Sequence, residues 1–112
     1  KIQIGGNNRQ NELISLRKGK RGDLWFHAQE SPGSHIVLKS SNGLVDEKDI
    51  QLAADLASLF SRARANKQVP ILMVPIENLQ RISGALPGTV SHRGGKVIWG
   101  RAERAKKFFQ HK

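Results

Sequence analysis

Alternating apolar and polar positions mark short β-strands in the first part of the chain. Residues 24–28 (LWFHA) and 36–38 (IVL) flank the segment 31–34 (SPGS), and this pattern predicts a β-hairpin. Leu24, Phe26 and Ala28 share one face of the first strand, whereas Trp25 and His27 share the other. Residues 2–4 alternate in the same way before a Gly-Gly break, which predicts one more short strand.

The second part of the chain contains the signals of three further strands. Residues 69–74 predict a buried strand bracketed by Pro70 and Pro75. Residues 89–92 and 97–99 predict a second hairpin, because Gly94-Gly95 between them can adopt the positive φ angles of a primed turn.

Apolar positions with helical spacing predict two helices and a helical tail. Asn7 as N-cap with Gln10 three residues later indicates a helix over about residues 8–18. A long helix begins at Asp46, with acidic residues near its positive end and an apolar stripe at Ile50, Ala53, Ala57 and Phe60. The basic amphipathic segment 101–112 is expected to be a helical tail after a domain of residues 1–100.

Taken together, these elements predict an α+β fold with a single domain. A mixed β-sheet with two hairpins packs against one long helix, with a short N-terminal helix beside it. At 112 residues the chain is long enough for one hydrophobic core.

The first hairpin is expected to turn at Pro32-Gly33 as type II, with Gly33 at positive φ. A two-residue loop pairs His27 with Leu38, so the two histidines 27 and 35 face opposite ways and do not share a metal. For each histidine, a hydrogen-bonded structural role and a ligand contact are both open. Trp25 is expected to cover the sheet beneath the long helix, with base stacking as the alternative.

Charge points to the class of partner. Nineteen Lys and Arg residues against nine Asp and Glu residues give a net charge of +10, which favours a polyanionic partner over a merely solubilising surface. There is no cysteine, so disulfides and thiolate metal sites are excluded. Because no apolar run reaches the length of a membrane span, a cytoplasmic location without membrane contact is expected.

The sequence carries no recognisable catalytic constellation. Ser34-His35 lies on a strand, where neighbours point to opposite faces, and it is not a nucleophile elbow. The four histidines lack metal-ligand spacing, and no glycine-rich segment has the residues of a phosphate loop. We therefore expect a binding domain, with neither enzymatic activity nor a cofactor or metal.

Four stretches, in this order and spacing, resemble a known family. They are GGNNRQNELISL, DLWFHAQESPGSHIVLKS, SRARANKQVPI and ISGALPGTVSHRGGKVIWG, and together they cover about residues 2–100. They are similar to the NFACT-R domain, the RNA-binding module of NFACT proteins, which were often labelled fibronectin-binding proteins in bacteria.

The resemblance implies a role in ribosome-associated quality control. Its expected partners are tRNA (alanyl-tRNA in bacteria), the large ribosomal subunit and the NFACT-N domain of a longer chain, in support of template-free tailing of stalled nascent chains. Seven residues fall on the family's motif positions: Asn8, Asn11, His27, Pro32, Gly33, Ser34 and His35. Relatives often carry Lys where this chain has Leu86, so one phosphate contact is in question there.

Motif and charge together give the candidate nucleic-acid-binding residues. They are Asn8, Asn11, Arg17, Lys18, Lys20, Arg21, His27, Ser34, His35, Lys39, Arg93 and Lys96, with Pro32 and Gly33 as the structural turn. Arg93 and Lys96 rest on charge alone. Two other functions are open: a protein-interaction or adhesion module of the fibronectin-binding type, and a non-specific nucleic-acid binder.

Overall fold

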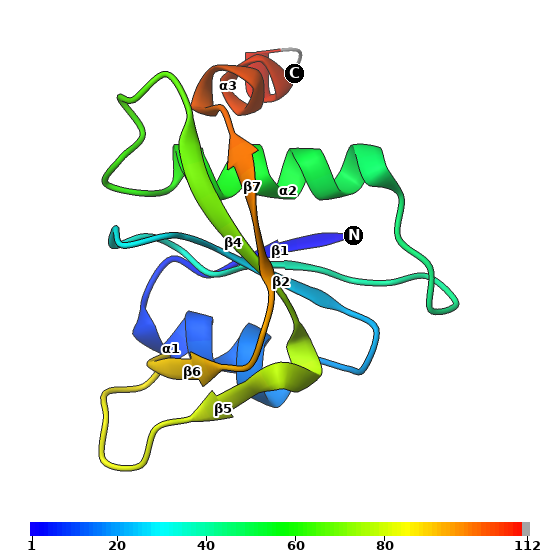
Figure 1. The fold of residues 1–112 in the computed structure, drawn as a ribbon, viewed down its shortest axis with the longest axis vertical. Helices are drawn as coiled ribbons and strands as arrows, with labels where there is room; N and C mark the ends of the chain where they lie inside the picture. Colours follow the sequence, from blue (N-terminus) through cyan, green and yellow to red (C-terminus); the bar gives the residue numbers. More distant parts are fainter. Residues whose placement is uncertain (111–112) are drawn as a thin grey trace.

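The computed structural model describes residues 1–110 and consists of one five-stranded sheet with helices on both faces and a small second sheet (Figure 1). Residues 111–112 of the expected tail, including His111, lie outside the described part. The strands are β1 (Ile2–Ile4), β2 (Leu24–Ala28), β3 (Ile36–Leu38), β4 (Val69–Pro75), β5 (Leu79–Arg81), β6 (Val90–His92) and β7 (Lys96–Gly100). The helices are α1 (Asn8–Glu12), which continues as the π-helical turn η1 (Leu13–Arg17), α2 (Glu47–Leu59), the 3₁₀ turn η2 (Ile76–Asn78) and α3 (Ala102–Gln110).

The large sheet has the strand order β1-β3-β2-β4-β7, and β5 pairs with β6 in the small sheet. The α+β class is confirmed, but the sheet is not mixed: every registered strand pair is antiparallel. No helix of the described residues is long and apolar enough to cross a membrane.

Helix α2 covers one face of the sheet and forms the larger core. Phe26, Ile36 and Ile71 point toward it and are fully buried. Small residues on α2, such as Ala53 and Ala57, allow the helix to lie close to the strands. Each fully buried Ile or Phe contributes about 1.5–3 kcal/mol to the stability of the fold.

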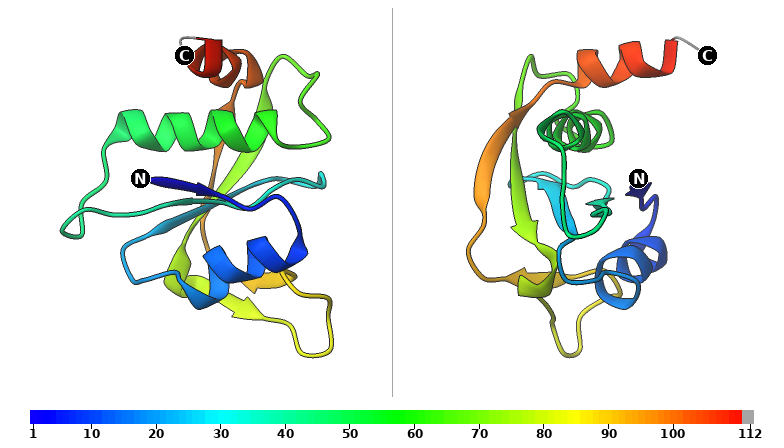
Figure 2. Two further views of the ribbon diagram at one scale, coloured as in Figure 1. Left: turned by 180° about the vertical axis from the view of Figure 1, so that it is seen from behind. Right: turned by 90° about the vertical axis from the view of Figure 1, so that its right-hand side faces the viewer.

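The opposite face carries a second core beneath α1, η1 and β5 (Figure 2). Trp25 is 4% exposed there and packs with Ile14, Val37 and Val74. The expectation that Trp25 is a core residue is confirmed. Its expected place beneath the long helix is wrong, because alternate strand residues face opposite ways and Phe26 takes the side of α2.

The first hairpin differs from the expected one by three residues in register. Phe26 pairs with Ile36, so His27 lies across from His35 rather than from Leu38. The chain turns earlier, at residues 29–30, with Glu30 at φ 54°. The prediction of a type II turn at Pro32-Gly33 is therefore wrong. Gly33 lacks a positive φ and forms an antiparallel bridge with Ser61 after α2.

The prediction of a second hairpin is also wrong, because β6 pairs with β5 and β7 pairs with β4. Gly94 and Gly95 do adopt positive φ angles of 63° and 102°, but they carry the chain from the small sheet to the large one. A Cβ on Gly95 would lie 2.8 Å from the carbonyl oxygen of Met73, so the close crossing requires glycine as well.

The tail forms helix α3, as expected, and packs against α2. Ala105 is fully buried in the core shared with α2. Arg104 Nε lies 3.0 Å from Asp55 Oδ2 on α2, which ties the two helices together.

Candidate nucleic-acid interface

An open groove of about 840 Å³ runs along one end of the molecule. Four segments that are far apart in the sequence form it: the start of α1 with the loop before it, the loop between β2 and β3, the end of α2 with the segment after it, and one residue of α3. The lining residues are Gly5, Gly6, Asn7, Asn8, Asn11, Pro32, Gly33, Ser34, Leu59, Phe60, Ser61, Arg62, Arg64 and Phe109. None of them is acidic, so the groove carries positive charge.

The first wall is held by local hydrogen bonds at the start of α1. Asn7 caps the helix as expected, because its Oδ1 accepts from the Gln10 backbone N–H at 2.9 Å. The Gln10 side chain in turn accepts from the Gly6 N–H at 2.7 Å. Gly5 donates to the His35 carbonyl oxygen at 2.9 Å, and a Cβ at Gly5 would overlap the Asn11 side chain. The wall is therefore rigid.

The second wall, Pro32 to Ser34, is fastened to the segment after α2. The Ser34 N–H donates to the Phe60 carbonyl oxygen, and the Arg62 N–H donates to the Pro32 carbonyl oxygen, both at 2.9 Å. A Cβ on Gly33 would lie only 3.0 Å from Ser61 Cβ. Gly33 is thus required for close packing and not for a left-handed backbone.

Asn11 joins the first two walls. It is 8% exposed, and its Oδ1 accepts from the backbone N–H of His35 at 3.2 Å. Asn8, one turn earlier, is exposed at the groove. The two asparagines therefore differ in what they offer: Asn8 is accessible to a ligand, whereas the Asn11 side chain mainly supports the groove from behind.

The two histidines lie behind the second wall, in contact with each other. Their ring centroids are 5.5 Å apart, and Trp25 stacks on His27 and meets His35 edge-on. Ser15 Oγ and His35 Nδ1 lie 2.8 Å apart in a buried hydrogen bond. The histidines thus share one side of the sheet, contrary to the expected opposite orientation.

Burial controls the charge of both imidazoles. Desolvation, with His27 nearby as a lesser cause, lowers the pKa of His35 to about 4. Desolvation also lowers the pKa of His27, although contacts with backbone groups of Ala28 and Gly33 oppose the shift. Both rings are therefore neutral near pH 7 and support the β2–β3 loop without adding charge.

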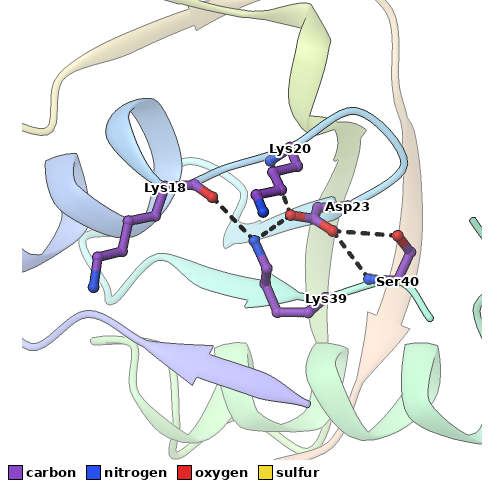
Figure 3. Close-up of polar contacts among 5 residues, drawn as sticks. All are labelled: Lys18, Lys20, Asp23, Lys39 and Ser40. Carbon is purple, nitrogen blue, oxygen red and sulfur yellow. Dashed lines mark hydrogen bonds and ion pairs between the residues drawn. The ribbon is translucent and has the colours of Figure 1, made fainter. Parts of the chain in front are cut away.

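Lys39 belongs to a buried polar cluster around Asp23, at the other end of η1 (Figure 3). Its Nζ donates to Asp23 Oδ2 and to the Lys18 carbonyl oxygen. The backbone N–H groups of Lys20 and Ser40 donate to the same carboxylate at 2.9 and 3.0 Å. The charge of Lys39 is thus compensated inside the protein.

The other cations near Asp23 point outward. Arg17, Lys18, Lys20 and Arg21 are all exposed, and Figure 3 shows the Lys18 side chain extending away from Asp23. Arg21 lies 3.9 Å from Glu77, an exposed and therefore weak ion pair. These four residues lie at the end of the first helix that is remote from the groove, and Arg93 and Lys96 are exposed near the link between β6 and β7.

The groove contains two cations that the candidate set lacks. Arg62 and Arg64 follow the C-terminal end of α2 and line the groove. The signal was present in the sequence, since these cations exceed what the helix dipole needs, but it did not indicate which loops face them. Gly88, in the loop before β6, also borders α1: its Cβ would lie 2.8 Å from the Asn8 carbonyl oxygen.

No described group of three or more histidine, aspartate or glutamate residues is arranged to hold a metal ion. The arrangement instead offers arginines, backbone groups and an exposed asparagine along an open channel. Such a set suits phosphates and the edges of unstacked bases.

Known proteins resemble this chain in sequence and in structure. The sequence matches the family model described as NFACT protein RNA binding domain over residues 1–94. A protein named Rqc2 homolog RqcH from Bacillus subtilis (strain 168) is 41% identical over 98 residues, and one from Streptococcus suis (strain 05ZYH33) is 39% identical over 97 residues. These alignments cover 88% and 87% of this chain but only 17% of each relative.

A solved structure is similar over nearly the whole fold. It is described as the C-terminal part of the fibronectin/fibrinogen-binding protein from Streptococcus suis, and it matches with a TM-score of 0.87 at 35% identity. The match covers 96% of this chain and 43% of that one. Sequence and structure together show that the chain belongs to the NFACT protein RNA binding domain family.

Proposed function

We propose that this domain binds RNA through the groove, as a non-catalytic module of a ribosome quality-control factor. One observation carries the proposal: the motif residues Asn8, Pro32 and Ser34 line the same groove as Arg62 and Arg64, and the lining contains no carboxylate. An arginine can bind a phosphate through two parallel hydrogen bonds, and an exposed side-chain amide can contact a sugar or a base edge.

The relatives suggest the biological setting. Two of them are named Rqc2 homologs, and this chain spans 17% of their length. We propose that tRNA, alanyl-tRNA in a bacterial context, and the large ribosomal subunit are the RNA partners. The domain acts beside an NFACT-N domain of a longer chain, which supports template-free tailing of a stalled nascent peptide.

Substitution of the two groove arginines tests this function. In fluorescence anisotropy with a labelled tRNA, we expect Arg62→Gln/Arg64→Gln to weaken binding. The slope of log K against log salt should become shallower by about 1.4–1.8, because two phosphate contacts no longer release counterions. A DNA duplex of similar length, titrated in parallel, separates recognition of RNA from attraction by charge alone.

A matched control removes the same charge elsewhere. Lys1→Gln/Lys48→Gln neutralises two lysines beside the acidic start of α2, at the opposite end of this helix. We expect it to retain most of the tRNA affinity and the wild-type salt slope. Equal losses in both double variants would contradict the groove as the binding site and leave only a net-charge effect.

A second candidate function comes from the name of the structural neighbour, a fibronectin/fibrinogen-binding protein. In that case the domain would hold immobilised fibronectin after RNase treatment, and the groove arginines would not affect this binding. Release by RNase, or no binding at all, would exclude adhesion as the function of this domain.

A further inference from the structure

The outer face of β7, with the neighbouring Pro70 and Leu72 of β4, is the part of the large sheet that the described helices leave open, whereas Val74 further along β4 is buried in the second core. Ile98 packs into the core on the α2 side, and a Cβ on Gly100 would collide with α2. Because strand residues alternate, Val97 and Trp99 point the other way. Figure 1 shows β7 in the foreground, with no helix in front of it among the described residues.

This open face is apolar and has a large aromatic ring on the edge strand β7. Trp99 is 53% exposed and Val97 is 43% exposed, whereas the other tryptophan, Trp25, is 4% exposed. In the sheet register Trp99 lies beside Pro70, and Val97 lies beside Leu72, so the two rows form a continuous surface. An exposed apolar surface around a large aromatic ring indicates a binding site.

The charge around this face identifies the kind of partner. The strands β2, β4 and β7 contain no acidic residue. Lys67 and Arg101 lie at one end of the β4–β7 pair, and Arg93 lies at the other, next to Lys96, which alternates with Val97 and so starts on the α2 side of the strand. All four are exposed, and none has an ion-pair partner among the described residues. An apolar strip between two cationic ends suits bases joined by a phosphate backbone.

We propose that the outer face of β4 and β7 is a stacking platform for unpaired RNA bases, centred on Trp99. The bases stack on the indole ring and on the apolar strip, and the cations at both ends hold the flanking phosphates. Paired bases in a duplex cannot offer their faces in this way, so the platform distinguishes single strands from duplexes. It rests on the proposed RNA-binding function and adds a second contact surface to the groove.

The two tryptophans make this platform directly measurable. The chain has no tyrosine, so its intrinsic fluorescence comes from buried Trp25 and exposed Trp99. We expect a single-stranded RNA of mixed sequence to quench the exposed component in a saturable way, and a blunt RNA duplex of the same length to quench it much less. Acrylamide accessibility of Trp99 should fall in parallel.

Substitution of Trp99 measures the contribution of stacking to affinity. Each stacked base contributes about 1–3 kcal/mol, so Trp99→Ala should weaken single-strand binding by about 5- to 150-fold. Trp99→Phe, which keeps a ring, should retain most of the affinity. Leu44→Ala is the matched control, because Leu44 is 75% exposed in the loop before α2, and it should bind as wild type. Because Trp99 is exposed, its variants should keep the wild-type thermal midpoint.

The outcomes separate this proposal from the function on which it rests. If Trp99→Ala binds single strands as tightly as wild type while Arg62→Gln/Arg64→Gln binds weakly, the platform is overturned and the groove stands. If only fibronectin binding is lost in Trp99→Ala, the face belongs to a protein partner and the platform is again overturned. If the wild-type domain binds no RNA, both proposals fail.

Discussion

His35 has an environment that strongly disfavours its charged form. The ring lies edge-on to both Trp25 and His27, contacts Ser15 and is only 6% exposed. Its backbone meanwhile joins the groove walls, because its N–H donates to Asn11 and its carbonyl oxygen accepts from Gly5. Protonation of one buried ring therefore affects the same element that shapes the groove.

The low pKa of His35 predicts a loss of stability in mild acid. Its pKa is about 4 in the folded protein and ordinarily 6.5. Between these values the unfolded chain binds more protons, so the free energy of unfolding decreases as the pH falls from 6.5 toward 4. The decrease due to His35 amounts to roughly 3 kcal/mol at most. Above pH 6.5 both states are neutral at this position and the contribution is flat.

Urea unfolding at a series of pH values, compared between wild type and His35→Gln, checks this expectation. The variant is less stable near neutral pH but should lose much less of its remaining stability between about pH 6.5 and 4. His27, whose pKa is also lowered, contributes in the same direction and remains in both proteins. Parallel curves for the two proteins would contradict the assigned role of His35.

At the residue scale, local signals were predictable from the sequence and long-range ones were not. The N-cap Asn7 is confirmed, and Asp46, predicted only as the start of the long helix, proves to be its N-cap; each cap is a contact within one helical turn. The role of Gly33 was missed, since it depends on the approach of Ser61 after α2, and the turn at Glu30 was missed as well. A shift of three residues in the β2–β3 register then placed the two histidines on one side.

Asp23 connects three elements and is the main polar support of the sheet opposite the groove. Its carboxylate holds Lys39 after β3, and through Lys39 it reaches the last turn of η1. Burial alone would raise its pKa, but the hydrogen bonds from Lys39, Ser40 and Lys20 outweigh this effect and lower the pKa of Asp23. The charged carboxylate therefore stabilises the folded state above its ordinary pKa, and this contribution is lost as the pH falls below that value.

Removal of one partner of this pair should cost more than removal of both. Asp23→Ala leaves Lys39 half-buried without a counter-charge, and we expect the free energy of unfolding to fall by about 3 kcal/mol. Asp23→Ala/Lys39→Met should recover part of the loss. Denaturant unfolding of the two single variants and the double variant gives the coupling energy, and strict additivity would show that the ion pair contributes nothing.

The boundaries of the helices and strands could be predicted from the apolar periodicity, whereas the pairing of the strands could not. The long helix was predicted to begin at Asp46 and begins at Glu47, within one residue, because the acidic residues near its start and the apolar stripe are both local signals. The segment Leu79–Arg81 (LQR) contains a single apolar residue and was missed as β5, although it is the partner that β6 takes. Without β5, the glycine pair 94–95 suggested the wrong hairpin.

Charge is distributed unevenly over the whole molecule. Asp46, Glu47 and Asp49 lie at the start of α2, whereas Arg62 and Arg64 lie beyond its end. The helix has 13 residues, so these two groups are about 20 Å apart. This separation exceeds the screening length of about 8 Å at physiological ionic strength. The acidic end therefore hardly affects the groove under these conditions.

Removal of negative charge at the start of α2 should therefore change RNA affinity only at low salt. Glu47→Gln/Asp49→Asn keeps the Asp46 cap and removes two negative charges. RNA affinity should stay within about twofold of wild type at physiological salt, and it should rise clearly near 0.01 M salt, where the screening length is about 30 Å. Anisotropy titrations at both salt concentrations provide the comparison. A large gain already at physiological salt would mean that RNA reaches the acidic end directly.

The candidate site as a whole was only partly predictable. The motif residues Asn8, Asn11, Pro32, Gly33 and Ser34 meet in one groove, although they come from two separate segments. Arg62 and Arg64 join them only because the β2–β3 loop pairs with the residues after α2, a contact that no periodicity reveals.

The groove has a consequence for the order of events during synthesis of the protein. Its walls come from residues 5–11, 32–34 and 60–64, and the sheet behind them is completed only by β4 and β7. A nascent chain that has not yet reached residue 100 lacks the edge strand on which α2 rests. Under the proposed function, RNA binding requires the completed sheet, so a domain truncated before β7 is not expected to compete for RNA with the finished one.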